Sequence, residues 1–168
     1  MSDAPPTHRQ RQPGDGWVEC ACGRRHWGLY GAAGLLLVRR AADGAPVAVV
    51  LQHRALWSDQ GGTWGVPGGA RMPGESPEDA ALREAEEEAG IDRVAVRLRE
   101  SRVLQHDDWS YTTVIADEVS PVHPTVTDAE SVELRWVPVD EVADLPLLPA
   151  FATAWPMLRT RIAALGTP

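Results

Sequence analysis

The sequence predicts an α+β fold, in which helices pack against a β-sheet. Three observations lead to this prediction. Residues 77–89 carry the end signals and the 3.6-residue periodicity of an amphipathic helix. Residues 31–38 and 47–52 are apolar runs, rich in β-branched side chains, on either side of a turn sequence. Residues 149–165 again space their apolar side chains as a helix does.

The size and composition of the chain fit one domain. It has 168 residues, of which 43% are hydrophobic, enough for a single core. Residues 1–15 are polar and proline-rich, so we expect a disordered N-terminal tail followed by one domain over residues 16–168. A net charge of −8 argues against a nucleic-acid polymer as a partner. Because no membrane-length apolar run and no signal-peptide core are found, we expect a soluble, cytoplasmic protein that binds no membrane.

The two cysteines lie close together near the N-terminus. Cys20, Cys22 and His26 are residue types that bind zinc, yet a structural zinc site takes four ligands and no further cysteine exists. We therefore favour a short hairpin or loop with two reduced thiols, with a zinc site as the alternative. The Cys-x-Cys spacing disfavours a disulfide between the two cysteines.

Strand-like segments lead up to the first helix. Residues 31–38 and 47–52 flank the turn AADGAP and predict a hairpin. In the loop of residues 53–60, Arg54 is either a phosphate-binding side chain or a plain surface arginine. Residues 64–69 (WGVPGG) form a strand-like piece that ends in a glycine turn, which lets backbone carbonyl groups approach a ligand closely.

The helix over residues 77–89 has recognisable signals at both ends. Ser76 is a suitable N-cap, Pro77 takes the first helical position, and Asp79 completes a short capping box. Gly90 is a typical C-terminal stop. The small apolar stripe that suits close packing on a sheet consists of Ala81, Leu82, Ala85 and Ala89.

Carboxylates gather on one side of this helix. Three of them, at i, i+3 and i+4 beside the apolar stripe, are Glu84, Glu87 and Glu88. Such a cluster of oxygens is typical of a Mg²⁺ or Mn²⁺ site, whereas Glu86 points towards water. A solvated acidic helix is the alternative that the helix alone leaves open. Glu75 lies where its carboxylate can hold the guanidinium group of Arg83 and fix the start of the helix.

Further strands and a second helix follow. Residues 94–105 read as a strand with a bulge, and residues 111–116 as the next strand. Trp109 and Tyr111 lie on one face of that segment, where aromatic rings either stack on a purine or complete the core. The remaining predicted elements are a polar loop over 120–129, a strand over 130–138, a short helix from residue 139 and the helix over 149–165.

Residues 69–91 resemble the Nudix box, G-x5-E-x7-R-E-U-x-E-E-x-G-U, in which U is a bulky or apolar residue. The chain matches every specified position, from Gly69 and Glu75 to the segment REAEEEAGI that starts at Arg83; Ala85 is a small residue at a U position. So many fixed identities make the motif specific. The resemblance implies the Nudix fold, an α/β/α sandwich with a central mixed β-sheet. It also implies an enzyme that acts on acid anhydrides in phosphorus-containing compounds, hydrolysing a nucleoside diphosphate linked to another moiety with a divalent metal.

The resemblance further implies roles for individual residues. The ligands of Mg²⁺, or alternatively Mn²⁺, are Glu84, Glu87, Glu88 and the backbone carbonyl of Gly68. A metal-bound water then attacks phosphorus in line. The general base is either Glu87 or a carboxylate of a later loop, for which Glu130 is the best placed and Asp128 its rival. Glu75 and Arg83 orient the box. The candidates for substrate binding are Arg54, Trp109 and Tyr111.

The choice among substrate classes rests on elimination. The proline that ADP-ribose hydrolases tend to carry beyond the box is missing here, and Tyr111 lies late for the tyrosine of dinucleoside polyphosphate hydrolases. A MutT-like nucleoside triphosphate pyrophosphohydrolase remains, with an oxidised purine nucleotide as a candidate substrate. Hydrolysis of ADP-ribose or of a dinucleoside polyphosphate is the alternative.

Two functions of other classes also need a test. An isopentenyl diphosphate isomerase shares the fold but needs a catalytic cysteine beyond the first strands, and both cysteines here precede Gly31. A non-catalytic nucleotide-binding regulator is disfavoured by the complete set of three glutamates. The implied partner is a nucleotide-type small molecule, and we expect a monomer or a homodimer.

Overall fold

The computed structural model describes residues 10–166, so residues 1–9 of the expected tail lie outside the described range. Residues 10–15, which we also assigned to the tail, form a turn. The Asp15 N–H donates to the Gln12 carbonyl at 2.9 Å, and the Gln12 N–H donates to the Asp15 carboxylate at 2.8 Å. The Gly14 carbonyl accepts the Leu29 N–H at 2.9 Å, which fastens this turn to the segment that enters the domain.

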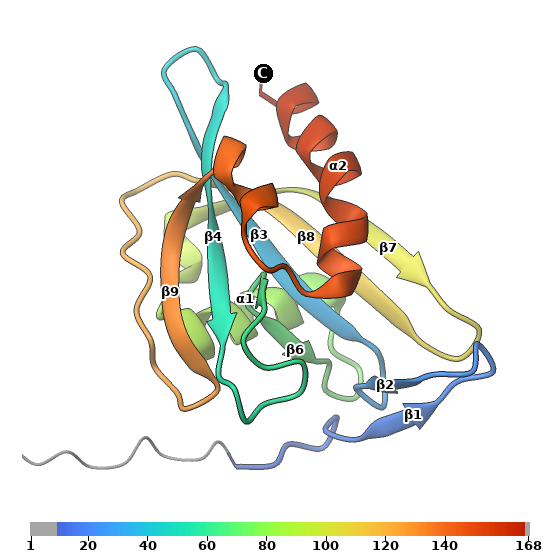
Figure 1. The fold of residues 1–168 in the computed structure, drawn as a ribbon. Coiled ribbons are helices and arrows are strands. Elements are labelled where there is room, and N and C mark those ends of the chain that lie inside the picture. The colour runs from blue at the N-terminus through green and yellow to red at the C-terminus, as the bar shows by residue number, and fades with distance from the viewer. Residues whose placement is uncertain (1–9, 167–168) are drawn as a thin grey trace, which may run out of the picture.

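A mixed sheet of seven strands forms the centre of the fold (Figure 1). Its strands are β3 (Ala32–Arg40), β4 (Pro46–Arg54), β5 (Trp64–Gly65), β6 (Gly68–Ala70), β7 (Val96–Gln105), β8 (Ser110–Glu118) and β9 (Ser131–Pro138). The order is β5-β4-β3-β8-β7, with β6 paired to β3 and β9 paired to β4. Strands β3 and β8 run parallel, and the other pairs are antiparallel. The predicted hairpin β3–β4 and the bulge in β7 are confirmed.

Strands β3 and β4 separate along part of their length, and the glycine turn of residues 64–69 occupies the gap. These strands pair only near their connecting turn, from Val38 and Val49 onward. At the start of β3, residues Ala32 to Gly34 pair with β6 instead of β4. A Cβ atom on Gly68 would lie 2.6 Å from the Gly34 Cα atom, so only glycine allows this approach. The WGVPGG segment therefore enters the sheet in front of the first helix.

Helix α1 (Pro77–Ala89) has the predicted bounds and caps. The Ser76 hydroxyl accepts the Asp79 N–H at 3.1 Å, and Gly90 adopts a left-handed conformation with φ of 64°. The apolar stripe of α1 packs in one cluster with Leu35 and Leu37 of β3. Because this stripe is built mainly of alanines, the helix lies close to the sheet and carries its carboxylates to the sheet surface.

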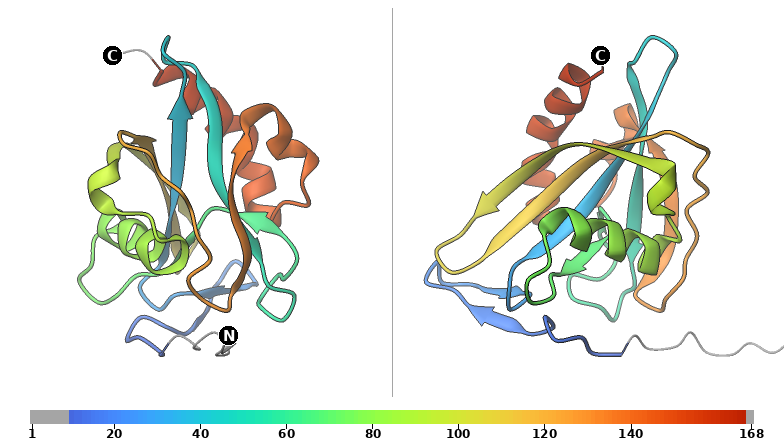
Figure 2. Two further views of the ribbon diagram at one scale, coloured as in Figure 1. Left: turned by 90° about the vertical axis from the view of Figure 1, so that its left-hand side faces the viewer. Right: turned by 180° about the vertical axis from the view of Figure 1, so that it is seen from behind.

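The opposite face of the sheet is covered by helix α2 (Pro149–Ala164) and the 3₁₀ helix η2 (Val139–Asp144). Leu36 and Val38 of β3 point to this side, alternating with the residues that face α1. Figure 2 (left) shows the sheet edge-on between α1 on one side and α2 on the other. These layers confirm the expected α/β/α sandwich. A short 3₁₀ helix, η1 (Arg93–Ala95), leads from α1 into β7.

A separate two-stranded hairpin precedes the central sheet. Strand β1 (Trp17–Glu19) pairs antiparallel with β2 (Arg25–Trp27), and Cys20 and Cys22 lie in the turn between them as free thiols. This is the short hairpin that we favoured for the segment around the two cysteines. In Figure 1 it lies beside the turn that joins β7 to β8. Within residues 10–166, no helix is long and apolar enough to span a membrane.

Candidate active site

Arg83 of α1 is clamped by the loop that precedes the helix. Its Nε and NH2 groups donate to the two carboxylate oxygens of Glu75, each at 2.8 Å, which is the bidentate pair that the spacing predicts. The hydrogen bonds from Arg83 hold the pKa of Glu75 below its usual value, and the same pairing raises the pKa of Arg83. Arg83 also donates to the Ala70 carbonyl at 3.0 Å, so it joins β6 to the start of the helix.

The same guanidinium group reaches the predicted metal ligands. Its NH1 group donates to Glu84 at 2.7 Å and to Glu87 at 3.3 Å. The Glu84 side chain is fully buried, and a Cβ atom on Gly69 would lie 2.7 Å from its carboxyl carbon. The side chain of Glu87 is 34% exposed. Gly69 of the box therefore leaves room for the Glu84 carboxylate between β6 and α1.

Glu88 is buried against β4 and β6. It is 3% exposed and accepts the Gly68 N–H at 3.1 Å and the Gln52 side-chain amide at 3.3 Å. Gln52 is itself buried and donates to the Ser131 hydroxyl at 2.6 Å. Glu88 is thus held directly from β4 and β6, and β9 supports it through the bond between Gln52 and Ser131.

The loop between β8 and β9 adds two more carboxylates. One oxygen from each of Glu88, Asp128 and Glu130 lies within 4.8 Å of the others. The loop is fixed to the end of α1, where backbone carbonyls lack helical partners: the Thr127 hydroxyl donates to the Glu87 carbonyl. Both loop carboxylates that we predicted as rival general bases therefore lie close to Glu88.

An open cleft lies beside Glu87 and Asp128. It has a volume of about 400 Å³, and its lining residues are Gln10, Arg11, Gln12, Pro13, Glu87, Thr127 and Asp128. The Gln12 side-chain carbonyl accepts a hydrogen bond from Arg83 at 3.3 Å, so the N-terminal turn is tied to the box. One wall of the cleft is thus made by residues that we had placed in the tail.

The predicted substrate-binding side chains occupy different places. The Tyr111 hydroxyl fills the space beside Gly34, where a Cβ atom would overlap it. Burial, together with the charge of Glu88, raises the pKa of Tyr111, so its hydroxyl stays protonated as a donor. Arg54 is near enough to oppose that rise, and its Nε donates to the Asp59 carbonyl at 2.9 Å.

Trp109 lies beside Tyr111, with a ring-centroid distance of 6.2 Å, and also contacts the N-terminal hairpin. Its indole N–H donates to the Trp27 carbonyl at 3.1 Å, and its ring stacks on His26 with a centroid distance of 4.3 Å. The structure thus confirms that Trp109 and Tyr111 lie on one face, and it adds the contact of Trp109 with the N-terminal hairpin.

The donor set fits a hard divalent cation. Carboxylates that converge within 4.8 Å repel one another, and a bound cation relieves that repulsion. All the side chains that converge on Glu88 offer oxygen atoms or an amide, which suits Mg²⁺ or Mn²⁺ rather than a thiophilic metal.

Several residues of the site were not predicted from sequence. Gln52 ends an apolar run in a strand, and a polar side chain in such a place signals a buried hydrogen-bond partner. Its role in the site could therefore have been predicted from the sequence. Ser131 carries no comparable signal. Gln12 and the rest of the cleft wall lie in a stretch whose composition is typical of disorder, which hid their role.

The Glu75–Arg83 pair makes a prediction about acid stability. Because the pKa of Glu75 is lowered in the fold, its stabilising contribution is complete above the usual pKa of 4.5 and is lost as the pH falls through its folded value. We expect Glu75→Gln to lower the free energy of unfolding at neutral pH by about 1.5–3 kcal/mol. The difference from wild type should shrink steadily below pH 4.5. Urea unfolding across the pH range measures it, and a difference that stays constant into acid would contradict the prediction.

Comparison with known proteins agrees with this geometry. A model of the NUDIX domain matches residues 29–160. The chain is 52% identical to a Mycobacterium tuberculosis protein named "Putative 8-oxo-dGTP diphosphatase 3", over 95% of this chain and 76% of that protein. It is 50% identical, over 97% of its length, to the "Nucleoside triphosphate pyrophosphatase/Nudix hydrolase fusion protein" of Bifidobacterium longum, and spans 34% of that longer protein.

A solved structure shows the same likeness in three dimensions. The crystal structure of RenU, a Nudix hydrolase from M. smegmatis, is 49% identical and superposes with a TM-score of 0.82, covering 92% of this chain and 99% of that one. The motif, the domain match and these relatives lead to one conclusion: the chain belongs to the Nudix hydrolase family.

Proposed function

We propose that the chain is a metal-dependent nucleoside triphosphate pyrophosphohydrolase, with an oxidised purine nucleotide as its preferred substrate. The observation that carries this proposal is the convergence of Glu88 with Asp128 and Glu130 beside the cleft over Glu87. The names of the relatives, a diphosphatase of an oxidised purine nucleotide and a nucleoside triphosphate pyrophosphatase, support the choice of substrate class.

In the proposed site, Glu84, Glu87, Glu88 and the Gly68 carbonyl hold Mg²⁺, with Mn²⁺ as the alternative. A bound divalent ion supplies positive charge to the diphosphate and lowers the pKa of a bound water. Arg83 and Glu75 fix the helix that carries the glutamates, because the 2.8 Å bidentate pair joins the loop to α1. Gln52 and the Gly68 N–H orient Glu88 through hydrogen bonds to its carboxylate.

The proposed general base is Glu130. Asp128 shapes the loop, because its Oδ1 atom accepts the Glu130 N–H at 3.0 Å. The Glu130 carbonyl accepts the Ala55 N–H at 2.8 Å, which anchors this residue to the segment after β4. A carboxylate that is fixed beside Glu88 is well placed to accept a proton from a water at the site.

The nucleotide is proposed to enter over the N-terminal turn. Arg11 lines the cleft and brings a positive charge to a site rich in carboxylates, so it is a candidate phosphate-binding residue together with Arg54. The protonated Tyr111 hydroxyl offers a donor beneath the glycine turn. With a net charge of −8, the chain suits a free nucleotide rather than a nucleic-acid polymer. We propose a cytoplasmic monomer or homodimer.

A panel of substrates tests the proposal. The full chain is assayed with Mg²⁺ or Mn²⁺ against nucleoside triphosphates, oxidised dGTP, ADP-ribose and diadenosine polyphosphates, and the products are separated. We expect a nucleoside monophosphate and pyrophosphate, with kcat/KM for oxidised dGTP at least about tenfold above dGTP, the worth of one good hydrogen bond.

Each alternative predicts a different result in the same panel. If ADP-ribose or a diadenosine polyphosphate is cleaved fastest, the proposed substrate class is wrong, but the proposed catalytic site stands. Calorimetric nucleotide binding without turnover under either metal would identify a regulator instead. An isomerised, intact diphosphate would identify an isomerase and overturn the hydrolytic assignment.

A further inference from the structure

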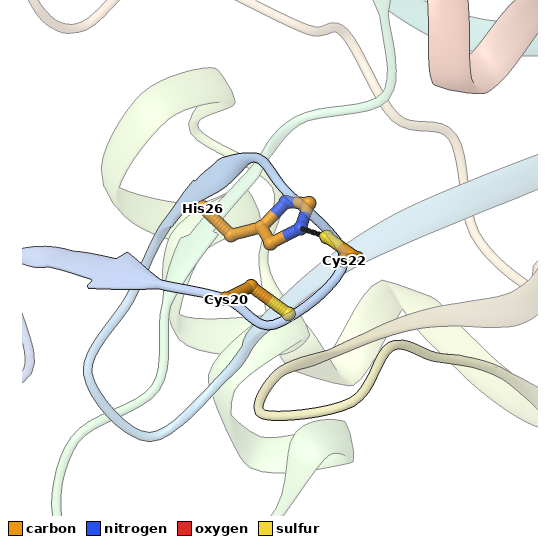
Figure 3. Close-up of side chains that lie close together, drawn as sticks. All are labelled: Cys20, Cys22 and His26. Carbon is orange, nitrogen blue, oxygen red and sulfur yellow. Dashed lines mark hydrogen bonds between the residues drawn. The ribbon is translucent and has the colours of Figure 1, made fainter.

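The turn of the N-terminal hairpin gathers three side chains of metal-binding type away from the catalytic carboxylates. Cys20 and Cys22 lie in the turn and His26 in β2, and one ligand atom from each lies within 4.8 Å of the others (Figure 3). The Cys22 sulfur and the His26 Nε2 atom are 3.2 Å apart. Figure 3 shows the His26 ring turned towards Cys22, with the Cys20 side chain on the same side of the turn.

The backbone of the turn is built for this convergence. The Cys20 N–H donates to the Arg24 carbonyl at 3.0 Å, and the Gly23 N–H donates to the Cys20 carbonyl at 3.0 Å. Gly23 has φ of 87°, a left-handed conformation that favours glycine, and it lets the chain reverse directly after Cys22. The short turn thereby points both thiols to the same side as His26.

A second segment, remote in sequence, supports the cluster. The Asp108 N–H donates to the Cys20 sulfur at 3.4 Å, and the Asp108 carboxylate accepts the Ala21 N–H at 2.7 Å. The ring of His106 lies next to His26, with a centroid distance of 4.5 Å. The turn between β7 and β8 therefore presents an N–H group to a thiol and a fourth side chain of metal-binding type.

We propose that Cys20, Cys22, His26 and His106 form a structural zinc site. Two sulfur and two imidazole ligands are a set that tetrahedral Zn²⁺ takes in proteins. The ring of His106 lies 4.5 Å from that of His26, and in the proposed site its side chain would turn to supply the fourth ligand. The sequence had offered only three ligands, and the fourth comes from a segment that the fold places against the hairpin.

Zinc at this place would connect two parts of the molecule. It would join the hairpin to the β7–β8 turn, a link that now rests on the contacts of Asp108 and Trp109. The segment that leaves the hairpin in turn holds the N-terminal turn, because the Leu29 N–H donates to the Gly14 carbonyl at 2.9 Å. A zinc ion would thus brace the wall of the cleft without taking part in its chemistry.

The test measures bound metal in the full chain and does not depend on catalysis. Protein is prepared without chelators or added metal, and its zinc content is determined by elemental analysis and native mass spectrometry after extensive dialysis against metal-free buffer. We expect one zinc per chain. Replacement by Co²⁺ should give the thiolate-to-cobalt charge-transfer band, which the catalytic carboxylates cannot produce.

Matched variants assign the ligands. Cys20→Ser, Cys22→Ser, His26→Gln and His106→Gln should each lose the zinc, whereas His123→Gln, a change of an exposed histidine in the β8–β9 loop, should keep it. Circular dichroism confirms that each variant is folded. Removing zinc from the wild type should lower Tm by several degrees and expose both thiols to a thiol reagent.

Two results would overturn the proposal. One is a wild-type chain without zinc whose two thiols react at the same rate before and after zinc is added. The other is a cobalt form that lacks the thiolate band. Because neither measurement uses the enzymatic reaction, the zinc site and the proposed catalytic function fail or succeed independently.

Discussion

A Glu88→Gln variant is expected to lose at least about 100-fold in kcat/KM with Mg²⁺ while keeping its fold. Removal of a side chain that only supports a metal ligand typically costs about 10–100-fold, and loss of a ligand should cost no less. Glu88 is central to the site, since it meets Asp128 and Glu130 and is oriented by the Gly68 N–H and Gln52. The amide of glutamine keeps the size of the side chain and removes its charge, so the packing around α1 should survive.

Two further variants make this result specific. Glu87→Gln should also lose most metal-dependent turnover, because its carboxylate lines the cleft. Glu86→Gln is the matched control: its side chain lies on the same helix and is exposed, so turnover should stay close to wild type. Steady-state rates over a Mg²⁺ titration, with circular dichroism as the check on folding, measure all three. Near wild-type rates in Glu88→Gln, or a large loss in Glu86→Gln, would contradict the ligand assignment.

The parts of the site that sequence predicts correctly are those set by local rules. Ser76 and Gly90 define the ends of α1, and once the ends are known the helical repeat fixes the directions of Glu84, Glu87 and Glu88. The Glu75–Arg83 pair belongs to the same short segment. All of these relations span fewer than two dozen residues of chain, so no knowledge of tertiary structure is needed to state them.

The parts that sequence leaves open depend on how distant segments meet. Asp128 and Glu130 are rivals in the sequence, and the fold brings both to Glu88 because Thr127 fastens their loop to the end of α1. Trp109 and Tyr111 share a strand face as predicted, with ring centroids 6.2 Å apart, but sequence alone does not reveal that Trp109 also stacks on His26 of the hairpin. The turn at Gln12 shows no periodicity, and only its docking against Arg83 reveals it as a wall of the cleft.

The largest effect on stability is expected from Arg83→Met, which should lower the free energy of unfolding by about 3–5 kcal/mol. The Arg83 side chain is 16% exposed and donates to Glu75, Glu84 and the Ala70 carbonyl. Methionine matches its length but leaves the fully buried Glu84 carboxylate without its 2.7 Å partner. A charge that loses its partner in the interior costs far more than the pair contributed, because it cannot regain its hydration.

Urea unfolding without divalent metal measures this loss, and two comparisons identify its cause. Adding Glu84→Gln to Arg83→Met should restore about 1–3 kcal/mol, because a neutral amide takes the place of the stranded carboxylate. Arg93→Met should cost less than about 1 kcal/mol, since Arg93 of η1 and Asp79 of α1 form a 3.4 Å pair whose side chains are 53% and 59% exposed. Equal losses in Arg83→Met and Arg93→Met would mean that burial of Glu84 does not govern the energetics of the box. In that case the guanidinium group would serve chiefly to orient the glutamates, and its removal would appear in turnover rather than in stability.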